Sequence, residues 1–173
     1  MTGKTHLAVG VGAGITIGIT SALSGCNPTI AVLSAASCAI GSLMPDIDSR
    51  KSKAGKEMKI TSFFVNKIFG HRGFVHSPLC LAIFTIPLIA GLKLTNYNEF
   101  IPLVFGFIAG YISHLVLDTM TKGGIPWLYP ISKNKFSLCK IRSGSFLEIL
   151  IAFVVLALFI AGYLGVWSLL NGH

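Results

Sequence analysis

The chain has 173 residues, which fits one domain, and only 12% of them are Asp, Glu, Lys or Arg. Soluble domains carry about 25% charged residues, and the mean hydropathy here is +0.75, so an ordinary soluble protein is excluded. The net charge of +8 is typical of chains that meet nucleic acid or an anionic membrane surface, and the long apolar stretches favour the membrane.

Five apolar stretches approach the length of about 20 residues that a transmembrane helix needs. They cover residues 7–24, 29–44, 78–94, 100–117 and 146–170. Short links join the first to the second and the third to the fourth, which predicts two antiparallel helical hairpins. The expected fold is all-α. It is a single integral membrane domain over residues 1–173, with about five transmembrane helices and two long loops at 45–77 and 118–145.

Glycines recur at four-residue spacing in the first stretch, at Gly10, Gly14 and Gly18, and in the fourth, at Gly106 and Gly110. Such spacing predicts helices that pack closely in a membrane. A cleavable signal peptide is the alternative for the first stretch, because a basic residue precedes it and small residues follow it. Its core is rich in Gly and Thr rather than Leu, which favours a packed helix.

Between the second and third stretches, Pro45 should end or bend the helix and leave Asp46 and Asp48 in an extended run. Residues 56–69 form a basic amphipathic segment, which either lies in the headgroup plane or packs on the protein. The four cysteines have no CxxC spacing, and we interpret them as reduced packing residues.

Thirteen of the fourteen basic residues fall in the N-terminus and the two long loops, and only Lys93 falls elsewhere. Five spans place those three segments on the same side of the membrane. The excess of basic residues in cytoplasmic segments then predicts a multi-pass protein of the cell (inner) membrane. Its N-terminus should be cytoplasmic and its C-terminus outside.

Each of the five helices brings an imidazole or a carboxylate to this same face. Ionisable groups near bilayer depth are costly and usually mark function. The side chains predicted to bind metal are His6, Asp46, Asp48, His71, His76, His114, Asp118 and Glu148. Mixed imidazole and carboxylate ligands suit Zn²⁺, with Mn²⁺ or Fe²⁺ as alternatives. Eight ligands are enough for two ions of about four ligands each.

The motifs resemble a family of membrane-bound metal-dependent hydrolases, the YdjM-like proteins associated with LexA regulation in bacteria. The matching parts are His6, 44–48, 70–77, 110–114, Asp118, Thr121, 124–126, Pro130, 143–145 and Glu148. The family's usual Leu-Pro-Asp and Thr-His-Ser appear here as Met44-Pro45-Asp46 and Val75-His76-Ser77, which leaves the proposed ligands untouched. The resemblance implies a multi-pass membrane hydrolase that uses divalent metal.

The expected reaction is hydrolysis of a phosphoester in a lipid or lipid-linked substrate at the cytoplasmic membrane surface. Bound metal would activate a water at neutral pH, and Asp48 or Glu148 would act as general base or bridging ligand. Arg72 would pair with phosphate oxygens through its planar donor fork; the alternative is that it anchors the loop at the membrane surface.

Two other functions remain open. A metal-ion or proton transporter also uses intramembrane His and Asp, but it would place them near the bilayer midplane in repeated halves. A membrane regulator would bind metal without catalysis. Nucleic acid is not an expected partner, because topology accounts for the basic residues and they lack interleaved aromatic residues. Membrane lipids and the substrate are the expected partners, and the sequence leaves the oligomeric state open.

Overall fold

A computed structural model describes residues 1–48, 63, 67 and 72–171 of the chain. Within these residues every element of regular secondary structure is a helix, which confirms the all-α bundle. The helices are α1 (Gly3–Leu23), α2 (Pro28–Leu43), α5 (Pro78–Leu94), α6 (Ile101–Thr119) and α7 (Phe146–Asn171). Three short 3₁₀ turns accompany them: η1 (Met44–Asp48), η2 (Phe74–His76) and η3 (Asn98–Phe100). Most of the expected amphipathic segment at 56–69 lies outside the described residues.

Four of these helical segments are long and apolar enough to cross a membrane: α1, α2 with η1, η3 with α6, and α7. Helix α5 is apolar as well, but with 17 residues it is shorter than these four segments. Large apolar side chains, such as Val32, Phe84, Phe105 and Phe153, are exposed on the outer faces of the helices. Such a surface suits hydrocarbon rather than water, and it supports a membrane location.

Helix α2 lies between α1 and α6, and glycines make both contacts close. A methyl group added at Gly14 of α1 would collide with the Ala35 carbonyl oxygen of α2. On the other side, a methyl group at Gly110 of α6 would collide with the Cys38 carbonyl oxygen. The predicted packing role of the spaced glycines is confirmed at these positions, where only glycine allows the backbones to approach so closely.

The segment after α2 differs from the sequence expectation. Pro45 does end the α-helix, but Asp46 and Asp48 lie in the 3₁₀ turn η1 and not in an extended run. Proline is tolerated near the start of a helical turn, where its missing N–H would have no partner in any case. The tighter turn therefore continues the direction of α2 and keeps both carboxylates at its end.

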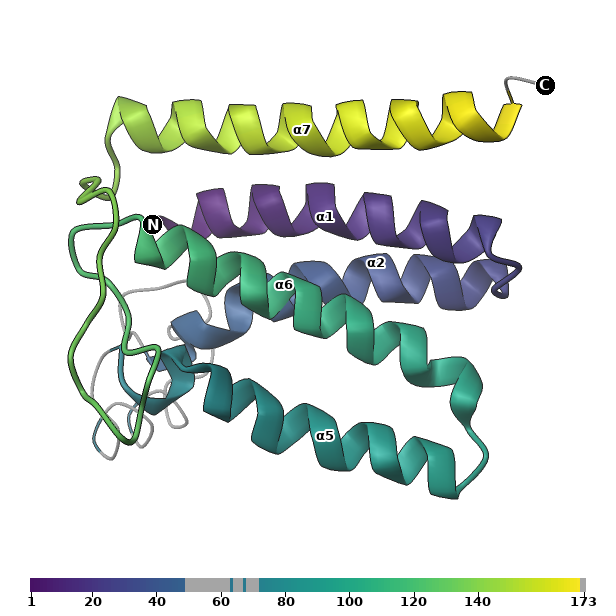
Figure 1. Ribbon diagram of the computed structural model, residues 1–173, viewed down its shortest axis with the longest axis horizontal. Coiled ribbons are helices and arrows are strands. Elements are labelled where there is room, and N and C mark those ends of the chain that lie inside the picture. Colours follow the sequence, from purple (N-terminus) through teal and green to yellow (C-terminus); the bar gives the residue numbers. More distant parts are fainter. Residues whose placement is uncertain (49–62, 64–66, 68–71, 172–173) are drawn as a thin grey trace.

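The ends of the helices that carry the predicted ligands gather at one end of the bundle, the end marked by the N-terminus in Figure 1. The C-terminal end of α7 lies at the opposite end (Figure 1). The segment between α6 and α7 runs across the ligand-bearing end, and its residues Thr121 and Ile125 are buried there. A cap fixes the start of α5 at this end, because the Ser77 hydroxyl accepts from the Cys80 N–H.

The close contact of α6 with α2 can be tested with Gly110→Ala. The added methyl group should force the two helices apart and lower the free energy of unfolding by about 1–3 kcal/mol. Gly91→Ala in α5 is the matched control, because nothing lies within 4 Å of a methyl group there. It should be neutral or stabilising, since alanine favours helix over glycine. Thermal unfolding in detergent would compare them, and equal stabilities would contradict the packing.

Candidate metal centre

The side chains that meet at this end come from four parts of the fold. They are His6 at the start of α1, Asp46 and Asp48 in η1, His76 in η2, and His114 and Asp118 in the last turns of α6. We call these six residues the His–Asp cluster. All are buried except Asp46, which is half-buried.

The ring of His114 has a fixed orientation. Its Nδ1 lies 2.7 Å from the backbone carbonyl oxygen of Ser42. A carbonyl only accepts hydrogen bonds, so Nδ1 carries the proton and Nε2 offers an electron pair. The ring also stacks on that of His6, with ring centroids 3.7 Å apart. A histidine held through one nitrogen by a backbone carbonyl, with the other nitrogen turned inward, is the usual state of a metal ligand.

His76 is oriented in a similar way by a carboxylate. Its Nδ1 lies 3.0 Å from Oδ2 of Asp48. A carboxylate at this distance favours the tautomer with its proton on Nδ1, in which Nε2 offers a second electron pair. The Nε2 atoms of His76 and His114 are 3.3 Å apart. Two electron pairs that face each other at this distance repel unless a proton or a cation lies between them. The donor set therefore suits a positive ion.

Asp118 connects the histidines. Its Oδ2 lies 3.6 Å from Nε2 of His76 and 3.8 Å from Nε2 of His114. Ligand atoms bonded at about 2.0–2.1 Å to one tetrahedral zinc ion lie roughly 3.3 Å from one another, so these three atoms have nearly the spacing of a shared ion.

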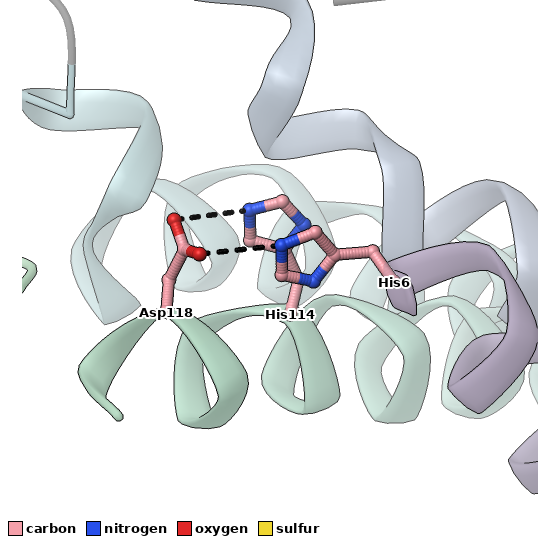
Figure 2. Close-up of side chains that lie close together, drawn as sticks. All are labelled: His6, His114 and Asp118. Atoms are coloured by element: carbon pink, nitrogen blue, oxygen red, sulfur yellow. Dashed lines mark ion pairs between the residues drawn. The ribbon is translucent and has the colours of Figure 1, made fainter. Parts of the chain in front are cut away.

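The other oxygen of Asp118 faces a different side of the cluster. Its Oδ1 lies 3.2 Å from Nε2 of His6 and also contacts the amino group of Met1. Figure 2 shows the two carboxylate oxygens directed at two different imidazole rings, those of His6 and His114. The Nδ1 of His6 is buried and has no hydrogen-bond partner among the described residues.

Ligand atoms from the cluster form two groups compact enough to hold a metal ion. One group contains His6, His114 and Asp118, and the other contains Asp46, His76 and His114. Within each group the atoms lie within 4.8 Å of one another. The structure therefore brings together six of the eight predicted ligands, and five of the six belong to these two groups.

Arg72 reaches the cluster from a position two residues before η2. Its Nη2 lies 2.8 Å from Oδ2 of Asp118, and its Nη1 donates to the Thr121 hydroxyl at 3.0 Å. Its backbone N–H donates to Oδ2 of Asp48 at 2.8 Å. The guanidinium lies directly over Gly123, where a methyl group would collide with Nη1. The glycine thus makes room for the cation beside the cluster.

Glu148 has a different set of partners. Its Oε1 accepts from the Thr2 N–H at 2.6 Å, from the Thr2 hydroxyl at 2.7 Å and from the Thr5 hydroxyl. Its Oε2 accepts from the Gly144 N–H at 2.7 Å. Oε1 thus connects the start of α7 to the start of α1, and Oε2 holds the turn before α7. Glu148 belongs to neither compact group of ligand atoms. Its metal-binding role stays a prediction.

Some of the site follows from sequence and some does not. His71 was also predicted as a ligand, and it lies outside the described residues. Thr121, whose hydroxyl contacts Arg72, is one of the residues that match the motifs of the family. The Ser42 carbonyl and the N-terminal threonines were missed, because backbone acceptors and common hydroxyl residues carry no recognisable signal.

Comparisons with known proteins also indicate a membrane protein. The profile of a family described as "YdjM inner membrane protein" matches residues 1–171. The uncharacterized protein YvsG of Bacillus subtilis is 37% identical over 153 residues, which are 87% of each chain. The inner membrane protein YdjM of Escherichia coli is 36% identical over 134 residues, which are 76% of this chain and 62% of that protein. No solved structure matches the chain.

The contact between α1 and α7 can be tested with Thr5→Val, which keeps the side-chain shape and removes the hydroxyl that donates to Glu148. A hydrogen bond to a charged group contributes about 1.5–3 kcal/mol, so the free energy of unfolding in detergent should fall by that amount. Thr20→Val is the control, because that hydroxyl is exposed and bonds only to carbonyls of its own helix. Equal losses in both variants would show that the Glu148 contact contributes nothing.

Proposed function

The chain belongs to the YdjM family of inner membrane proteins, and on that premise we propose that it is a membrane-bound hydrolase dependent on divalent metal. Its reaction is the cleavage of a phosphoester in a lipid or a lipid-linked substrate. The observation that carries the proposal is the convergence of Nε2 of His76, Nε2 of His114 and Oδ2 of Asp118 within 3.3–3.8 Å. Three buried donors so close together favour a cation, and the mixture of nitrogen and oxygen suits Zn²⁺, Mn²⁺ or Fe²⁺.

The proposal includes two ions rather than one. The oxygens of Asp118 face different histidines, His6 on one side and His76 with His114 on the other. Donors on both sides of this carboxylate would serve two ions, the number typical of phosphoester hydrolysis. His6, Asp46, His76, His114 and Asp118 would hold the ions, of which Zn²⁺ is the first candidate. Bound ions would neutralise charge on the phosphate and lower the pKa of a water.

Arg72 would bind the substrate phosphate. Its guanidinium already lies against Asp118 and Thr121, and its planar fork of donors matches phosphate oxygens. Asp48 and Glu148, which the sequence offered as general bases, accept hydrogen bonds from Arg72 and from the N-terminal threonines. We therefore assign both to positioning: Asp48 orients His76 and Arg72, and Glu148 fixes the start of α1.

The site would face the cytoplasm. The long loops that adjoin it, 45–77 and 118–145, carry twelve of the fourteen basic residues, and such loops are retained on the cytoplasmic side. Its place at one end of the bundle (Figure 1) also favours a surface enzyme over a carrier, which would need its ionisable groups near mid-membrane.

Metal binding is tested with His114→Ala and Asp118→Asn. His114 belongs to both compact groups and Asp118 to one of them, so the purified variants should lose most of the metal that the unmodified protein holds, measured by elemental analysis. Asp48→Asn should weaken metal affinity by about 10–100-fold, as expected for a residue that orients a ligand.

Glu99→Gln is the matched control for the loss of a carboxylate, because Glu99 is exposed in η3. It should leave the metal content unchanged. Unchanged metal in His114→Ala and Asp118→Asn would remove the basis of the proposal.

The role of Arg72 is tested with Gly123→Ala, because the added methyl group should displace the flexible guanidinium and little else. Metal content should stay constant, while turnover of a phospholipid in detergent micelles should fall about tenfold or more, as for the loss of a charged contact to phosphate. Arg72→Lys keeps the positive charge but not the planar fork of donors. It should likewise keep its metal content and lose turnover. Liposome assays in which metal crosses the membrane without any lipid hydrolysis would favour the transporter instead.

A further inference from the structure

An apolar cavity of about 590 Å³ lies among α2, α5 and α6, beside the His–Asp cluster. Pockets that bind small molecules typically measure about 300–1,000 Å³, so the cavity has the size of a ligand site. Helix α5 lines it from Cys80 to Leu88, and α6 lines it from Leu103 to Tyr111. Each stretch covers eight residue steps, or about 12 Å along a helix, so the cavity is elongated along the helices.

The chemistry of the lining excludes a polar occupant. Apart from Ser37, its hydroxyl groups already have partners in the protein. The Tyr111 hydroxyl donates to the Val75 carbonyl oxygen, and the Thr85 hydroxyl donates to the Leu81 carbonyl oxygen. The remaining lining is almost wholly aliphatic and aromatic. A polar group in this cavity would lose its hydrogen bonds to water without replacement, so the occupant must be hydrocarbon.

One end of the cavity touches the residues that carry the cluster. Ile47 lies between Asp46 and Asp48, and Val75 directly precedes His76. Tyr111 lies three residues before His114 on the same helix, and residues at this spacing share a helical face. A molecule whose chain occupies the cavity would therefore hold its head next to the histidines.

The cavity is also continuous with the membrane-facing surface. Phe84 and Leu88, which line it, are 66% and 52% exposed. Both lie on the apolar helix α5, whose outer face suits hydrocarbon. A chain could thus enter sideways from the bilayer without crossing water.

We propose that this cavity holds one acyl chain of a membrane phospholipid, with the phosphate of that lipid at the His–Asp cluster and Arg72. The proposal rests on the proposed function and names its substrate class, because a metal site with an adjoining guanidinium takes the phosphate and the apolar cavity takes the chain. Transfer of a chain from the bilayer brings little hydrophobic gain. Selection therefore comes from shape along the cavity and from the anchored headgroup.

The test uses a phosphatidylglycerol that carries a photoreactive diazirine in one acyl chain, in vesicles that contain the full-length protein with its metal. Mass spectrometry would map the adducts. We expect them at Phe84, Leu88 and Phe107 in excess over lipid-facing residues of α7 such as Phe153. Ser37→Phe narrows the cavity from α2 and should lower these adducts roughly fivefold or more.

Ala36→Phe is the matched control: it adds a similar volume at the next residue of α2, where the side chain is exposed, and should leave the labelling unchanged. A diacylglycerol with the same diazirine, which lacks the phosphate, should label the cavity less than the phospholipid does. Uniform labelling of all membrane-facing helices, or labelling unaffected by Ser37→Phe, would overturn the proposal. So would an unlabelled cavity, which another protein segment would then fill.

The assay does not depend on turnover, so the two proposals can fail separately. Cavity labelling that follows Ser37→Phe, without hydrolysis of any phospholipid, would support the acyl-chain site and contradict the proposed hydrolase. Hydrolysis together with uniform labelling would support the hydrolase and overturn the acyl-chain site.

Discussion

Helices α1 and α6 approach α2 so closely that a methyl group at Gly14 or Gly110 would collide with backbone carbonyls of α2. At these two glycines backbone meets backbone directly, so the helix axes are held there by backbone shape rather than by adaptable side-chain packing. Few other arrangements leave a buried histidine from each neighbour close enough to stack, as His6 and His114 do with ring centroids 3.7 Å apart. The positions of His6 and His114 therefore depend on glycines, which have no side chain, one and two helical turns away.

The same helical faces serve packing and chemistry. In α6, Gly106, Gly110, His114 and Asp118 follow one another at intervals of four residues, and in α1 His6 precedes Gly10 and Gly14 at the same interval. Residues at this spacing lie along one face. Each glycine face that contacts α2 therefore continues into the cluster, where the contact between backbones is replaced by a contact between donor atoms.

Much of this arrangement could be predicted. The five helices were recognisable because apolar runs are bounded by capping and turn residues, as Ser77 and Pro78 bound α5. The gathering of His and Asp residues at one face followed from their positions at the ends of the predicted helices. The roles of the carboxylates did not, because they depend on which hydroxyls and N–H groups the tertiary fold brings near: Glu148 meets Thr2 and Thr5, and Asp48 meets Arg72. The cavity also escaped prediction, because it arises from the spacing between helices.

The clasp between Glu148 and the threonines of α1 joins the first helix of the chain to the last. Domains fold from the N-terminus as they are synthesised, yet this clasp cannot close until α7 has left the ribosome. Until then His6 lacks the support that fixes the start of α1. A chain that ends before Glu148 would thus leave the start of α1, and with it His6, without this contact. The geometry of the His–Asp cluster therefore depends on a contact that forms only once the start of α7 has been made.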